Sequence, residues 1–193
     1  MKTDDQLSSI LVMPENQITD SQNFLIFATA DGSVRKNNMD DFKNIQVNGK
    51  IAMKLKDSNK IVGVKICNDN DDILLSTKDG KCIRTPVSKL RTTKSRASIG
   101  VRGIKLTKDD SIISLSILSH LDVSSSEAKA YLKMSKANKE NIEENEEDQN
   151  DEIEDINISE DRFQEMKACE QFVLTVTENG FGKRTSSYQF RVT

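Results

Sequence analysis

Short apolar runs recur along the chain, and each ends in a polar turn that contains glycine. Phe24–Thr29 and Ile73–Thr77 are two such runs, and each is followed by Asp-Gly. A third copy, Phe172–Ser186, turns at Asn179-Gly180. Asp-Gly and Asn-Gly after a run of strand length are the strongest short signal for a β-hairpin, because both residues tolerate the positive φ that a tight turn requires. The pattern therefore predicts three hairpins.

The hairpins belong to a longer repeat with a period near fifty residues. Aligning the turn glycines brings three threonines and three cations into register, namely Thr29, Thr77 and Thr177, and Lys36, Arg84 and Arg184. The second half of the unit repeats as well, since GKIAMKL from Gly49 matches GVRGIKL from Gly100, and KIVGV from Lys60 matches SIISL from Ser111. Such a period, built from short strands, indicates propeller-like blades.

Each repeat is expected to contain four strands and no helix. After its hairpin, the first repeat should form strands at Ile51–Leu55 and Ile61–Ile66, and the second at Val101–Leu106 and Ile112–Leu118. The expected fold is all-β, with about two and a half blades of an incomplete disc. The expected domains are residues 1–118 for the first two blades, 119–169 for an acidic insert and 170–193 for the start of a third blade.

The insert has its own pattern. Ser124 and Glu127 have the spacing of a capping box and predict a helix that continues to Ala137. The strongly acidic residues 138–155 are expected to be disordered or extended. A short helix over 159–168 could bring Phe163 and Met166 onto the body. The favoured interpretation of the insert is a solvated surface loop, and the alternative is an acidic mimic that competes with nucleic acid.

The charges are segregated along the chain. Residues 1–118 hold 19 Lys and Arg against 14 Asp and Glu, a balance of +5, and residues 119–169 hold 6 against 15, a balance of −9. Between Asp79 and Asp109 there are nine cations and no acidic residue. Such a segment attracts a polyanion, and its lack of aromatics favours contact with duplex phosphates over stacking of single-stranded bases. The alternative is that these cations only keep strand edges soluble and unpaired.

No catalytic, cofactor or metal site is expected. His120 is the single histidine and has no nucleophile beside it, and the acidic run at Asp69–Asp72 lacks the spacing of a calcium loop. The three cysteines follow no CxxC spacing and predict reduced thiols in the cytosol, with Cys82 as a small buried strand residue. No apolar run is long enough for a bilayer, and the residues after Met1 do not predict a secretory signal.

Several of these motifs together resemble one known family. NGKIAMKL (48–55), GVRGIKL (100–106) and TENGFGKRT (177–185), in this order, are similar to the C-terminal domain of the bacterial DNA gyrase A protein, and the flanking FATADGSVRKN and KIVGVKI are similar to it too. The resemblance implies a β-pinwheel, in which neighbouring blades exchange strands and a basic rim wraps duplex DNA. It also implies a cytoplasmic, nucleoid-associated fragment of an ATP-dependent supercoiling enzyme.

The partners implied are double-stranded DNA, the rest of the gyrase A protein, and the gyrase B protein, with no membrane. The family's gyrase box and its DNA-cleaving tyrosine are absent from this sequence, so catalysis is not expected here. The matching domain of topoisomerase IV and a blade-repeat scaffold for a protein partner remain alternatives. The expected phosphate contacts are Lys36, Arg84, Lys89, Arg91, Lys94, Arg96, Arg102, Lys105, Lys183 and Arg184.

Overall fold

A computed structural model describes residues 7–13, 22–43, 47, 49, 51–56, 58–94, 98–140 and 158–193. The chain forms two compact units. The first contains Met1–His120 together with Val192–Thr193, and the second contains Leu121–Arg191.

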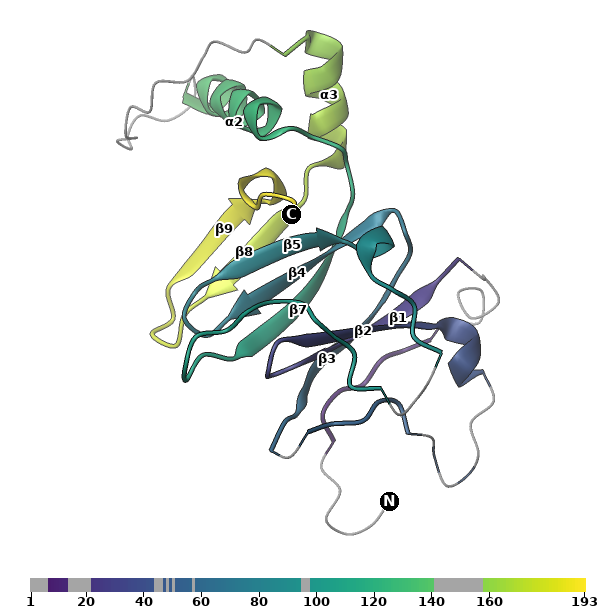
Figure 1. Cartoon of the computed structure of the whole chain (residues 1–193). Coiled ribbons are helices and arrows are strands. Elements are labelled where there is room, and N and C mark those ends of the chain that lie inside the picture. The colour runs from purple at the N-terminus through teal and green to yellow at the C-terminus, as the bar shows by residue number, and fades with distance from the viewer. Residues whose placement is uncertain are drawn as a thin grey trace. The chain divides into compact units, whose positions relative to one another are not determined.

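The first unit consists of two antiparallel sheets (Figure 1). A four-stranded sheet has the order β3-β1-β2-β6, and a three-stranded sheet has the order β5-β4-β7. The strands are β1 (Phe24–Thr29), β2 (Ser33–Asn38), β3 (Ile61–Cys67), β4 (Asp71–Thr77), β5 (Cys82–Pro86), β6 (Val101–Arg102) and β7 (Ile112–Ser119). The two sheets confirm the expected all-β repeat.

The hairpin turns have the same geometry in all three repeats. Gly32, Gly80 and Gly180 adopt φ values of +85°, +81° and +83°, a region that L side chains rarely occupy. The amide of each glycine donates to the carbonyl of the threonine three residues earlier, at 3.0, 3.1 and 3.0 Å. The sequence alignment of the three turns is therefore also a structural alignment.

Neighbouring repeats exchange a strand. β6 comes from the second repeat, yet it pairs with β2 of the first, with Val101 opposite Val34 and Arg102 opposite Ser33. Beyond Arg102 the chain leaves the ladder, because the amides of Gly103 and Ile104 both donate to the carbonyl of Gly32. The strand expected over Val101–Leu106 is thus only two residues long.

The strand expected at Ile51–Leu55 does not form; residues 51–56 are described but belong to no sheet. The equivalent segment of the second repeat pairs with the hairpin of the repeat before it. Among the described residues, no hairpin precedes Phe24 that could accept Ile51–Leu55 in the same way. A prediction of four strands within each repeat was therefore wrong, because the fourth position of a sheet is filled from the next repeat.

Apolar side chains cover both faces of β1. Ile26 and Ala28 belong to the cluster that also contains Ile73 and Leu75 of β4. The alternate residues Leu25 and Phe27 pack on the opposite face with Met39 and Met53. Burial on both faces explains why β1 has a continuous apolar run instead of an alternating pattern.

The buried cysteine is Cys67, whereas Cys82 is exposed at the start of β5, so the expectation for Cys82 was wrong. Cys82 occupies the outer part of the hairpin, next to the turn, where the strand has not yet entered the core. Burial raises the pKa of the Cys67 thiol to about 12.

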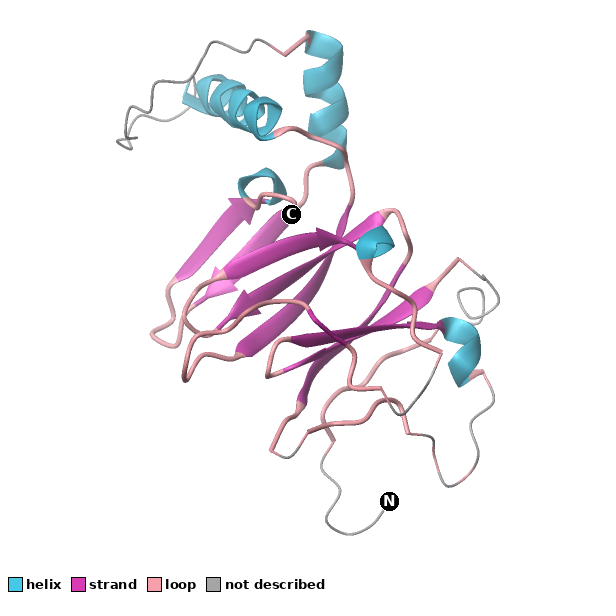
Figure 2. Cartoon of the chain, in the orientation of Figure 1, coloured by secondary structure: helices cyan, strands magenta, loops and turns pink. Residues whose placement is uncertain are grey.

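A 3₁₀ helix follows every hairpin, a feature that the apolar pattern did not predict. The three are η1 (Met39–Phe42), η2 (Val87–Lys89) and η3 (Ser187–Gln189), and their first residues are all buried. Runs this short leave no helical period in the sequence. Figure 2 shows them as short helical segments at the ends of strands.

The second unit combines a hairpin with two α-helices (Figure 2). β8 (Phe172–Val176) pairs with β9 (Gly182–Ser186), and the helices are α2 (Ser125–Glu140) and α3 (Glu160–Cys169). The capping box is confirmed, since the Ser124 amide donates to Glu127 at 2.8 Å and the Glu127 amide donates to the Ser124 hydroxyl at 3.1 Å.

The described part of the insert is a packed helical pair and not a solvated loop. Tyr131, Phe163 and Met166 are buried together with Tyr188 of the third repeat. The Tyr188 hydroxyl donates to the carbonyl of Met166 at 2.8 Å. Phe163 and Met166 thus contact the third repeat. Of the segment expected to be disordered, residues 138–140 end α2, and residues 141–155 lie outside the described part of the chain.

The exchanged strand yields a stability prediction for Gly100. This residue has φ +88°, and an added Cβ would lie 2.4 Å from the carbonyl oxygen of Val34. We expect Gly100→Ala to lower the free energy of unfolding, measured by urea denaturation, by about 3 kcal/mol or more, because the steric overlap adds to the backbone strain. Gly80→Ala is the matched control, since Gly80 has φ +81° but no atom within 4 Å of an added Cβ. Equal losses for the two variants would contradict the close approach of β6 to β2.

Candidate nucleic-acid interface

The cationic segment forms the outer margin of the first sheet. We call residues 87–102 the basic strap; the structure describes all of it except residues 95–97. Thr92 forms a parallel bridge with Lys36, and the Thr93 amide donates to the Lys36 carbonyl at 2.7 Å. Further along, Val101 and Arg102 pair with Val34 and Ser33. The strap therefore runs along the open edge of β2.

This placement gathers five of the ten expected phosphate contacts in or just after one strip of backbone. The distance along β2 from Ser33 to Lys36 is about 10 Å at the usual rise of a strand. The exposed cations of the strap and the residues just after it are Lys89, Arg91, Lys94, Arg102 and Lys105. None of these five forms an ion pair with another residue in the described part of the chain. Arg96 lies outside the described residues.

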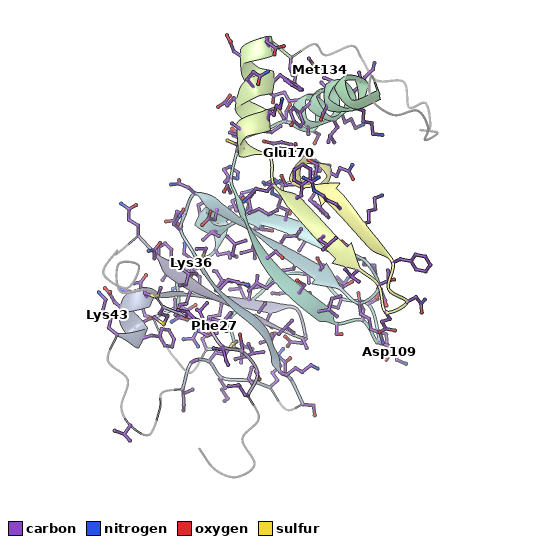
Figure 3. The ribbon with its side chains drawn as sticks, turned by 180° about the vertical axis from the view of Figure 1, so that it is seen from behind. Phe27, Lys36, Lys43, Asp109, Met134 and Glu170 are labelled. Carbon is purple, nitrogen blue, oxygen red and sulfur yellow. The ribbon has the colours of Figure 1, made fainter. Side chains whose placement is uncertain are left out.

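Two of the ten expected contacts are buried and paired instead. Lys36 has a side chain that is 4% exposed; its ammonium lies 2.5 Å from Asp69 and donates to the Val87 carbonyl at 3.2 Å. Figure 3 shows Lys36 among the side chains of the first unit. Arg84 is 4% exposed, and its Nε donates to Asp72 at 2.6 Å. Both cations stabilise the interior of the first unit.

The three repeat-equivalent cations use the same diagonal neighbour across the hairpin. The neighbour stands twelve residues earlier: Phe24 for Lys36, Asp72 for Arg84 and Phe172 for Arg184. The ammonium of Lys36 lies 3.9 Å from the centroid of the Phe24 ring, and the guanidinium of Arg184 lies 3.5 Å from that of Phe172. The position thus carries a cation–π contact or an ion pair. Arg184 and its neighbour Lys183 are both exposed in the second unit.

His120 has a structural partner that the sequence did not indicate. Its Nδ1 lies 2.8 Å from Oδ1 of Asp72, while the other oxygen of Asp72 accepts from Arg84. The side chain of Asp72 is fully buried, so both of its oxygens need partners. His120 is separated from Asp72 by 48 residues, and no local motif could have linked them.

The repeat alignment also contains a cationic position of which the sequence analysis used only Arg91. Eleven residues after each turn glycine stand Lys43, Arg91 and Arg191, and all three are exposed. Each comes shortly after the 3₁₀ helix of its repeat. Lys43 forms an ion pair with Asp40 at 2.5 Å. The signal was present in the sequence, because extending the glycine alignment by eleven positions reveals it.

The described residues contain no group of three or more His, Cys, Asp or Glu side chains placed to hold a metal ion. Within the same part of the chain, none of the helices is both long and apolar enough to cross a membrane.

The repeats match a known family. The family described as "DNA gyrase C-terminal domain, beta-propeller" matches residues 23–68, 71–119 and 171–193. The DNA gyrase A protein of Rickettsia bellii is 43% identical over 193 residues, which is all of this chain and 21% of that protein. The DNA gyrase A protein of Granulibacter bethesdensis is 38% identical over 97% of this chain and 21% of that protein. The chain therefore spans about a fifth of the length of these relatives.

Two solved structures align with about half of the chain. A DNA gyrase A C-terminal domain aligns with a TM-score of 0.47 and 24% identity, over 51% of this chain and 32% of that one. The C-terminal domain of a DNA topoisomerase IV aligns with a TM-score of 0.49 and 23% identity, over 53% of this chain and 32% of that one.

The buried ion pair leads to a prediction for Asp72. Asp72→Ala leaves the buried guanidinium of Arg84 without its carboxylate, so we expect a loss of about 3–5 kcal/mol in the free energy of unfolding. Asp40→Ala is the control, because the Lys43–Asp40 pair is 36% and 60% exposed and should contribute about 0–1 kcal/mol. Chemical denaturation of both variants checks this. A small loss for Asp72→Ala would show that Arg84 does not depend on this carboxylate.

Proposed function

The chain belongs to the DNA gyrase C-terminal domain family, and from that premise we propose that it is a non-catalytic module that binds duplex DNA along its basic strap. In the full enzyme the module wraps DNA and so supports ATP-dependent negative supercoiling. Its relatives are whole gyrase A proteins, of which this chain corresponds to about a fifth.

The observation that supports the proposal most directly is the solvent exposure of the cations in the basic strap. Lys89, Arg91 and Lys94 are exposed and stand close in sequence to Thr92 and Thr93, whose backbone pairs with Lys36 of β2. Each neutralised phosphate releases condensed counterions, so such cations give affinity that does not depend on base sequence. Arg102, Lys105, Lys183 and Arg184 complete the proposed contacts, and Arg96 is included on its place in the sequence.

Lys36 and Arg84 are left out of the proposed contact set. A buried cation with a carboxylate partner would have to break that pair and move its backbone to reach a phosphate, at a cost of several kcal/mol. They contribute instead to the folded core that carries the strap. Duplex DNA is favoured over single strands because the segment between Asp79 and Asp109 has no aromatic side chain on which bases could stack.

The partners that follow from this role are double-stranded DNA, the remainder of the gyrase A protein and the gyrase B protein. The place of action is the cytoplasm, where the chromosome lies. No cofactor is needed for phosphate contacts of this kind.

A salt titration of DNA binding tests the proposal. For about five phosphate contacts the slope of log K against log salt should be near −4 to −5. Replacing Arg91 and Lys94 together by Ala should reduce the size of that slope by about 1.8, because each lost contact removes about 0.9. The loss should be similar for unrelated duplex sequences.

The matched control is the double variant Lys60→Ala with Lys65→Ala. These lysines are exposed just before and within β3, the opposite edge strand of the same sheet, and the variant removes the same charge. It should leave the slope unchanged. A slope near zero for the unmodified protein, or equal effects of the two double variants, would refute DNA binding along the strap.

A further inference from the structure

We propose that Arg35 and Asn37, two buried residues of β2, are positioning residues that fix the described parts of the basic strap, at Thr93 and Ser98, in their DNA-binding conformation before DNA arrives. The inference rests on the proposed function. It concerns how the backbone that carries the phosphate-binding cations is held in place, and not which residues contact phosphate. It is carried by the way in which three successive residues of β2 hold the strap.

The side chain of Asn37 holds the middle of the strap. Its Nδ2 donates to the carbonyl of Thr93 at 2.9 Å and to a carboxylate oxygen of Asp41 at 3.0 Å. Asn37 is 0% exposed, whereas Asp41 and Thr93 are only partly buried. The Thr93 amide in turn donates to the carbonyl of Lys36, so both backbone groups of Thr93 are bound to β2.

The side chain of Arg35 holds the strap further along. One terminal nitrogen donates to the carbonyl of Ser98 at 3.0 Å, and Nε donates to the amide oxygen of Asn37 at 2.7 Å. Arg35 is 1% exposed, and burial lowers the pKa of its guanidinium while the nearby Asp41 carboxylate opposes that shift. Arg35 and Asn37 are therefore hydrogen-bonded to each other, and together they bind the carbonyls of Ser98 and Thr93.

The beginning of the strap is held by the residue between them. The ammonium of Lys36 donates to the carbonyl of Val87, the first residue of the strap. Its end is held by the pairing of Val101 and Arg102 with β2. Arg91 therefore lies between two held points, Val87 and Thr93, and Lys94 directly follows the held residue Thr93.

This arrangement lowers the entropy cost of binding. An irregular segment that becomes ordered only on DNA loses conformational freedom at that moment, at roughly 1–2 kcal/mol for each residue that is fixed. When the order is already present in the free protein, that cost belongs to folding and not to binding. Loss of the Asn37 side chain should then weaken binding without removing any phosphate contact.

The experiment compares Asn37→Ala with Asn38→Ala in the full 193-residue chain. Asn38 is the next residue of β2 and the same residue type, but it is exposed and forms no side-chain cap bond. Binding to a duplex of unrelated sequence is measured over a range of salt concentrations. We expect Asn37→Ala to bind about 3- to 10-fold more weakly with an unchanged salt slope, as one or two net hydrogen bonds imply. Asn38→Ala should match the unmodified protein.

Equal affinity of the two variants would overturn the proposal, and so would a salt slope reduced in Asn37→Ala, because that result means lost contacts and not a looser strap. Failure of the unmodified protein to bind would instead defeat the proposed function.

Amide hydrogen exchange of the unmodified, DNA-free protein gives a readout that does not depend on the folding of any variant. The Thr93 amide should be protected about as well as the amides of β2, although Thr93 lies in an irregular segment. Rapid, unprotected exchange at Thr93 would overturn the proposal.

Discussion

The open edge of β2 is the constraint on which the first unit depends. An edge strand exposes unpaired amide and carbonyl groups, and these must be covered or protected. Here the next repeat covers them, through Thr92 and Thr93 at one end and Val101 and Arg102 at the other. The same contact is repeated at β5, where Val192 forms a bridge with Arg84 and the Thr193 amide donates to the Arg84 carbonyl at 2.9 Å. Each repeat therefore completes the one before it.

This coupling determines where the cations lie. The segment that covers β2 follows this edge of the sheet, and its exposed Lys and Arg side chains therefore form a cationic margin there. At the centre of the hairpin the same residue types have the opposite role. Lys36 and Arg84 are buried because their strand lies between a core and the covering segment, and each needs a carboxylate to compensate for lost hydration. Charge alone does not distinguish the two roles, and neither does position in the repeat, because Arg184 stands at the same repeat position as Lys36 and Arg84 but is exposed.

The sequence predicted the features that depend on local chemistry. The hairpin turns, the strand Phe24–Thr29, the strand Ile112–Leu118, which the structure extends to Ser119, and the capping box at Ser124 all follow from residue type and short-range spacing. It did not predict features that depend on a partner far along the chain. Ile51–Leu55 has the composition of a strand but pairs with no strand among the described residues, and His120 meets Asp72 only after β4 and β7 have paired. The sequence also did not predict which cations are exposed. Arg84 and Arg91 have the same side chain, but Arg84 is buried and Arg91 is exposed.

The third repeat differs from the other two where it packs against the helices of the insert. Eight residues after the turn glycine stand Asp40 in the first repeat and Ser88 in the second, and both are exposed. The third repeat has Tyr188 there, which is 8% exposed and lies edge-to-face with Tyr131 at 5.1 Å between ring centroids. An aromatic at this position would be exposed in the other repeats, where no α-helix of the described residues covers it. The helical pair, although outside the residues that match the family, is therefore part of the core of the third repeat and not an independent appendage.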